Sequence, residues 1–129
     1  MRFDQAFGIH EQALKLRAKR AEVLAGNIAN VDTPGYKARD FDFNSMLQQE
    51  VKSSQRLATT NSKHIQSDTN IVPPSQMGYR VPSQPSLDGN TVDSQLEHSA
   101  FASNALEYQA SLRFVSGTVR TLRTAIKGQ

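Results

Sequence analysis

The 129-residue sequence contains no cysteine and no tryptophan, and no stretch of it approaches about 18 consecutive apolar residues. The lack of cysteine excludes disulfides, thiolate zinc sites, iron–sulfur clusters and a cysteine nucleophile; the lack of a long apolar run excludes a transmembrane helix. Residues 1–5 do not have the charged-then-apolar layout of a secretory signal peptide. Leu, Ile, Val and Phe account for only 29 of the 129 residues, so we expect at most one domain with a thin core.

Apolar residues near the C-terminus recur at alternating steps of three and four positions. This heptad pattern predicts a helix over about Thr91–Ile126, whose narrow apolar stripe suits a partner helix. Asn90 or Thr91 is the expected N-cap, because both side chains are polar and follow a turn at Asp88–Gly89. The stripe consists of Phe101, Ala105, Tyr108, Leu112, Val115, Val119, Leu122 and Ile126.

The N-terminal region shows the same kind of pattern and predicts a helix over about Asp4–Ile28. The helix is expected to stop because Thr33 precedes Pro34, and Thr33–Tyr36 fits a type II turn with a glycine at its third position. The apolar positions are Phe3, Phe7, Leu14, Ala21, Leu24, Ile28 and Val31.

The segment between the two predicted helices is polar. From Asn44 to Thr91, 28 of 48 residues are Ser, Thr, Asn, Gln, Pro or Gly. A short helix around Met46, Leu47 and Val51 and a short extended piece at Tyr79–Val81 are the regular structure expected there. The predicted fold is therefore mainly α, with two terminal helices (within 1–31 and 91–129) pairing as a coiled coil. A loop-rich segment, 32–90, joins them, and both ends form one assembly domain.

No arrangement typical of catalysis or ligand binding is found. His10, His64 and His98 are too far apart in sequence to match a metal-ligand pattern. Asp40 and Asp42 could form a carboxylate pair, but without a third ligand they fit solvated or capping roles better. The sequence therefore predicts a protein that is not an enzyme and has no metal, cofactor or small-molecule substrate.

The net charge of +3 raises the question of nucleic-acid binding. The densest basic run, Lys15–Arg20, has acidic neighbours at Glu11 and Glu22 and no interleaved aromatic residue for base stacking. A solvated helix face or a protein contact is therefore favoured, and no nucleic-acid partner is expected. A small basic helical protein that binds nucleic acid or acts as a chaperone remains the alternative from another class.

Two segments add a resemblance to a known family. Asn27–Phe43, with the run Asp-Thr-Pro-Gly-Tyr-Lys-Ala-Arg-Asp, is similar to the N-terminal motif of bacterial flagellar axial proteins, the rod, hook and hook-associated proteins. Tyr79–Asp93 is similar to the segment preceding the C-terminal helix in the proximal rod members. The resemblance implies a structural rod subunit in the basal body that transmits motor torque. Another rod subunit is the alternative within the family.

The resemblance also implies how such a subunit is delivered and assembled. Its terminal helices would pair as a coiled coil and pack against further copies, other rod subunits, and base or export-gate proteins of the motor. It would reach the periplasmic rod through the flagellar type III apparatus without a cleaved signal peptide.

The candidate site residues form two groups. A subunit-contact motif matches the first segment, with Tyr36, Lys37 and Arg39 as the expected contacts; alternatively, the motif only caps one helix and starts the loop. A helix seam provides the packing surface. The motif contains Asn27, Asn30, Asp32, Pro34, Gly35, Tyr36, Lys37, Arg39 and Asp40, and the seam contains Phe7, Leu14, Leu24, Ile28, Phe101, Tyr108, Leu112, Val115, Val119, Leu122 and Ile126.

Overall fold

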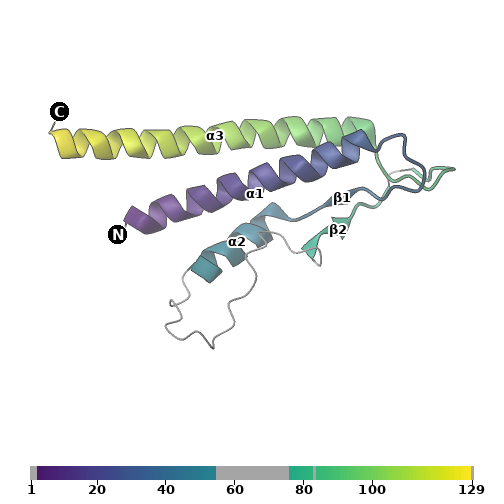
Figure 1. Ribbon diagram of the computed structural model, residues 1–129, viewed down its shortest axis with the longest axis horizontal. Coiled ribbons are helices and arrows are strands. Elements are labelled where there is room, and N and C mark those ends of the chain that lie inside the picture. Colours follow the sequence, from purple (N-terminus) through teal and green to yellow (C-terminus); the bar gives the residue numbers. More distant parts are fainter. Residues whose placement is uncertain (1–2, 55–75, 83, 129) are drawn as a thin grey trace.

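The computed structural model describes residues 3–54, 76–82 and 84–128. Helix α1 spans Phe3–Ala29, α2 spans Phe43–Ser54 and α3 spans Ser94–Lys127. Strands β1 (Arg39–Asp40) and β2 (Gly78–Tyr79) form a short antiparallel pair. In Figure 1, α1 and α3 run alongside each other in opposite directions, with the two termini at the same end and α2 on the other side of α1. The predicted mainly helical fold, with its two terminal helices packed together, is confirmed.

Helix α1 ends where the sequence predicts. The backbone N–H of Tyr36 donates to Thr33 O at 3.3 Å, and Gly35 has φ +71°, as the expected type II turn requires. A side chain at Gly35 would be strained in this left-handed conformation. Pro34 and Gly35 thus reverse the chain and send it back along α1.

Helix α3 starts three residues later than predicted, so the N-cap assignment to Asn90 or Thr91 is wrong. The N-cap is Asp93, whose carboxylate accepts hydrogen bonds from the backbone N–H groups of Gln95 at 3.1 Å and Leu96 at 3.3 Å. The physical reason is that the Asn90 and Thr91 side chains bond to the segment that follows α1, and so do not cap α3.

The short helix expected around Met46 and Leu47 is α2, and it completes a small apolar core. Leu16 of α1 is buried against Phe41 and Met46, with Val23, Phe43, Leu47 and Met77 packed around them. Asp42 caps α2 by accepting from the backbone N–H of Asn44 at 3.0 Å and the hydroxyl of Ser45 at 2.9 Å. The hydrogen bonds from Ser45 lower the pKa of Asp42. The capping role expected for Asp42 is confirmed. Residues 55–75, which include His64 and were expected to be part of the loop-rich segment, lie outside the described residues.

Candidate assembly surface and the polar clamp behind it

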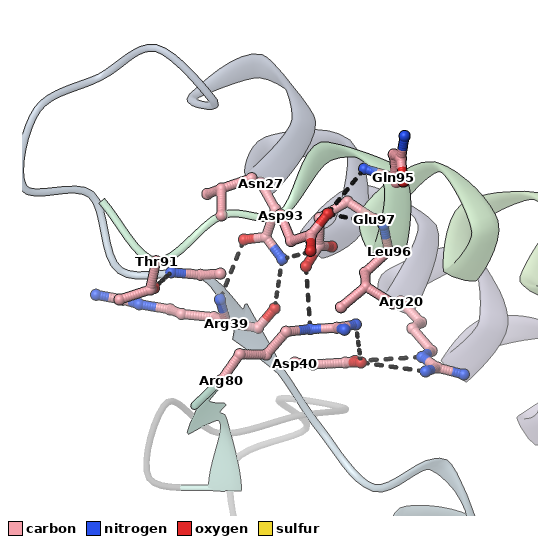
Figure 2. A network of polar contacts seen from close by, with 12 residues as sticks. Arg20, Asn27, Arg39, Asp40, Arg80, Thr91, Asp93, Gln95, Leu96 and Glu97 are labelled. Carbon is pink, nitrogen blue, oxygen red and sulfur yellow. Dashed lines mark hydrogen bonds and ion pairs between the residues drawn. The ribbon is translucent and has the colours of Figure 1, made fainter. Parts of the chain in front are cut away.

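Asn27, near the end of α1, joins three segments of the chain. Its side chain is fully buried; its amide nitrogen donates to Arg39 O at 2.7 Å and its amide oxygen accepts from Arg39 N at 3.1 Å. The same nitrogen donates to Glu97 Oε2 on α3 at 3.0 Å. The amide therefore pairs with both backbone groups of Arg39, as a neighbouring strand would, and ties β1 and α3 to α1 (Figure 2).

Two arginines and two carboxylates continue this network, as Figure 2 shows. Arg20 donates to both carboxylate oxygens of Asp40, at 3.2 and 3.1 Å, and Arg80 donates to Asp40 Oδ2 at 2.8 Å. Arg80 Nε lies 3.1 Å from Glu97 Oε1, a close charge contact without the alignment of a hydrogen bond. The hydrogen bond to Asp40 raises the pKa of Arg20. The charges balance, which lets Glu97 remain buried.

A second set of bonds connects the loop before α3 to the turn after α1. The buried Asn90 amide nitrogen lies 3.0, 2.8 and 2.8 Å from the carbonyl oxygens of Asn30, Val31 and Thr33. It therefore ties the loop before α3 to the turn that follows α1. Gly35 N donates to Asp88 O at 2.9 Å. We call Asn27, Arg20, Asp40, Arg80, Glu97 and Asn90 together the polar clamp.

The residues of the predicted subunit-contact motif differ in exposure: some are buried or half-buried, and others are exposed. Asn27, Asn30, Tyr36 and Asp40 make side-chain hydrogen bonds within the chain, and of the bonds cited only the one from Asn30, to Gly26 O, is to a carbonyl at the end of α1. Asp32, Pro34, Gly35, Lys37 and Arg39 are exposed. Among these, Lys37 donates to Gly89 O at 2.6 Å, and the Arg39 guanidinium lies 5.4 Å from the centre of the Tyr79 ring.

The helix seam divides in a similar way. Leu24 is buried, and Phe7, Leu14 and Ile28 on α1 are half-buried, as are Tyr108, Val115 and Leu122 on α3. Four α3 members are exposed: Phe101 by 38%, Leu112 by 47%, Val119 by 50% and Ile126 by 85%. They follow one another at seven- or eleven-residue steps and therefore share one side of α3. In the single chain, these four side chains remain exposed to solvent, and we call them the exposed row.

Several important residues were missed because they are polar at positions where the sequence pattern looks for apolar ones. Glu97 and Asn104 are 1% exposed on the side of α3 that meets α1, and Asn104 donates to Arg17 O at 2.9 Å. Arg17 also pairs with Glu107 and stacks over Phe43, with 4.0 Å between the guanidinium carbon and the ring centre. The sequence contained one sign of this arrangement. Asn104 directly precedes Ala105 of the apolar stripe, and Glu97 lies seven residues before Asn104, so the two polar residues share one side of the helix.

The described residues contain no group of three potential metal-ligating side chains, and none of their helices is both long and apolar enough to cross a bilayer. What the described residues do show is an internal network of hydrogen bonds and ion pairs and an exposed apolar row on α3.

Comparison with known proteins agrees with this arrangement. The family model described as flagella basal body rod protein matches residues 7–37, which are most of α1 and the turn after it. The flagellar basal body rod protein FlgB of Aeromonas hydrophila is 51% identical over 131 residues, covering 98% of this chain and 96% of the relative. The FlgB proteins of Escherichia coli K12 and Cereibacter sphaeroides are 44% and 43% identical and also cover 98% of this chain. This chain belongs to the FlgB family of flagellar basal body rod proteins.

Proposed function

We propose that the chain is a structural, non-catalytic subunit of the flagellar proximal rod that polymerises through α1 and α3. The observation that carries this proposal is the exposed apolar row on α3, formed by Phe101, Leu112, Val119 and Ile126. A continuous row of exposed apolar side chains marks an interaction surface, because covering it removes apolar area from water. Membership of the FlgB family supports the rod as the place where that surface is covered.

The proposed partners are further copies of the chain, other rod subunits, and base or export-gate proteins of the motor. Contacts that join different faces of successive subunits do not close into a pair and so build a helical tube. The exposed motif residues Asp32, Lys37 and Arg39 are available for contacts at the end of the hairpin. A tube held by such contacts would act as the drive shaft that transmits motor torque.

The proposed location is the periplasmic part of the basal body. Export through the flagellar type III apparatus without a cleaved signal peptide follows from the family resemblance. The small apolar core, centred on Leu16, Phe41 and Met46, fits a chain that is exported unfolded and ordered by its neighbours.

The test replaces apolar seam residues with aspartate in cells that carry no other copy of the gene. Leu112→Asp and Leu122→Asp place a charge in the apolar seam, and each is expected to abolish both incorporation into isolated basal bodies and swimming. Ala110→Asp, at an exposed position elsewhere on α3, is the matched control and should swim normally. Immunoblots verify that each variant is produced. Normal swimming of both leucine variants would contradict the proposed surface.

A further inference from the structure

The short ribbon formed by β1 and β2 has two edges, and one of them is closed by a side chain. Arg80 N donates to Ala38 O at 2.9 Å, and Arg39 faces Tyr79 at the next position of the register. Facing residues in an antiparallel ribbon alternate between pairs that bond to each other and pairs whose backbone groups point outward. Arg39 and Tyr79 are an outward-pointing pair, because both backbone groups of Arg39 bond to the Asn27 amide.

The other edge of the ribbon is open. The backbone N–H and C=O of Tyr79 point away from β1, and β2 lies on the side of β1 that faces away from α1 (Figure 1). Within residues 3–54, 76–82 and 84–128, no hydrogen bond to these two groups is found. Unpaired N–H and C=O groups on an extended segment are a template for a further strand. We call Tyr79–Val81 the open edge.

The side chains of the open edge are apolar and exposed. Tyr79 is 65% and Val81 91% exposed, and the two lie on the same face because side chains alternate along a strand. The Arg39 guanidinium lies 5.4 Å from the centre of the Tyr79 ring and helps to orient it. Aromatic and β-branched side chains stabilise a sheet when an apolar residue of a neighbouring strand stands beside them. The open edge therefore fits a strand with apolar residues at alternate positions.

A hollow of about 340 Å³ lies beside the open edge and adds a charge requirement. Gly78 contributes no side chain to it, and Gln76 and Asp42 are part of its lining. Hydrogen bonds from Ser45 lower the pKa of Asp42, so its carboxylate is ionised at neutral pH. Its donors, Ser45 and Asn44, are uncharged, and no ion pair of Asp42 is found within the described part of the chain. A cationic side chain that enters the hollow would meet this carboxylate.

We propose that the open edge receives an extended segment of another basal-body protein as a third strand of the ribbon. One residue of that segment would exchange both backbone hydrogen bonds with Tyr79, and its apolar residues would lie beside Tyr79 and Val81. A lysine or arginine of the same segment would enter the hollow at Asp42. This inference rests on the proposed rod function and adds the kind of partner that one surface binds.

A second copy of this chain does not provide a suitable strand. Two copies that paired through their open edges would form a self-complementary contact, which closes into a pair and builds no tube. The other strand of the described residues, β1, has no free edge, because Asn27 occupies one side and β2 the other. The partner is therefore a different protein.

Photo-crosslinking in isolated basal bodies tests the third strand. Benzoylphenylalanine is placed at position 79 in one chain and at position 81 in another, each as the only copy in the cell, and mass spectrometry locates the attachment sites. Because paired strands advance residue by residue, moving the probe by two positions should move the attachment site by about two residues within one partner segment. The probe at position 87 is the control, since Leu87 is exposed but outside the open edge, and it should not attach to that segment.

Substitutions test the backbone and the charge separately. Tyr79→Pro removes the outward N–H, and proline is tolerated at an edge position because the bonds to β1 are untouched. Tyr79→Ala is the matched control, which loses the ring but keeps the N–H. Incorporation into basal bodies should be about tenfold lower for Tyr79→Pro than for Tyr79→Ala. Asp42→Asn can still cap α2 but lacks the charge, and should reduce incorporation severalfold.

A further variant covers the case in which Tyr79→Pro is poorly produced. Val81→Lys changes an exposed residue, and a lysine on a strand edge opposes the addition of another strand. Normal incorporation of both variants, attachment sites that do not shift together, or attachment only to other copies of this chain would overturn the proposed strand and leave the rod function intact. Absence of the wild-type chain from basal bodies would instead overturn the rod function itself.

Discussion

At the scale of single residues, the polar clamp connects α1, β1 and α3 through buried and half-buried polar side chains, beside a small apolar core. Asn27 bonds to the backbone of Arg39 and to Glu97, and Asn90 bonds to backbone carbonyls in the turn that follows α1. Buried polar groups of this kind are costly when unpaired and specific when paired, because only one arrangement satisfies all of them. Replacing one partner therefore leaves the others buried without hydrogen bonds.

Asn27→Ala is expected to lower the free energy of unfolding by about 1–3 kcal/mol for each buried group that loses its partner. Asn27→Asp keeps the shape but removes the donor and sets a second carboxylate against Glu97, so it should also destabilise the protein. Urea titration followed by circular dichroism, at a protein concentration at which the chain is assembled with rod partners, measures both effects. Asn44→Ala, an exposed control, should stay within about 0.5 kcal/mol of the wild type. Wild-type behaviour of both Asn27 variants would refute the role of the clamp.

At the scale of helices and strands, the sequence predicts best those features that depend on residues close together in the chain. The limits of α1 follow from apolar periodicity and from Pro34, and the existence of α2 follows from Met46 and Leu47. The pairing of Arg39 with Tyr79 could not be predicted, because it depends on contacts 40 positions apart. The burial of Glu97 could not be predicted either. A search for apolar residues passes over a glutamate, and its burial depends on contacts with Asn27 and Arg80 from other segments.

The start of α3 illustrates the same limit and can be tested. The sequence analysis offered Asn90 or Thr91 as the cap, but both side chains bond to the segment after α1, and Asp93 caps the helix instead. Asp93→Ala should lower the free energy of unfolding by about 0.5–2 kcal/mol, whereas Asp93→Asn, which still accepts hydrogen bonds, should largely preserve it.

Chemical denaturation of the chain assembled with rod partners compares these variants with Ser94→Ala, which changes the next residue without touching the capping side chain. The control is expected to remain close to the wild type. A larger loss for Ser94→Ala than for Asp93→Ala would mean that α3 is capped elsewhere.

At the scale of the whole molecule, the fold buries few apolar side chains and leaves several large ones exposed along α3. Within the described residues, the buried apolar side chains are limited to Ala13, Leu16, Leu24, Ala38, Phe41 and Met46. Much of α3 beyond Asn104 has one side against α1 and the rest exposed. Covering this surface in the proposed rod would therefore add to the stability of the long helices, since an amphipathic helix gains most of its stability from packing.

The isolated chain is accordingly expected to be weakly helical in dilute solution and to gain helix as it assembles with rod partners. Circular dichroism at increasing protein concentration, with and without rod partners, measures this change. The ordering of α1 and α3 would coincide with binding, because covering the exposed row on α3 provides the burial that the single chain lacks. A monomer with a sharp unfolding transition at high temperature would contradict this, because it would show that the clamp and the small core suffice without any neighbour.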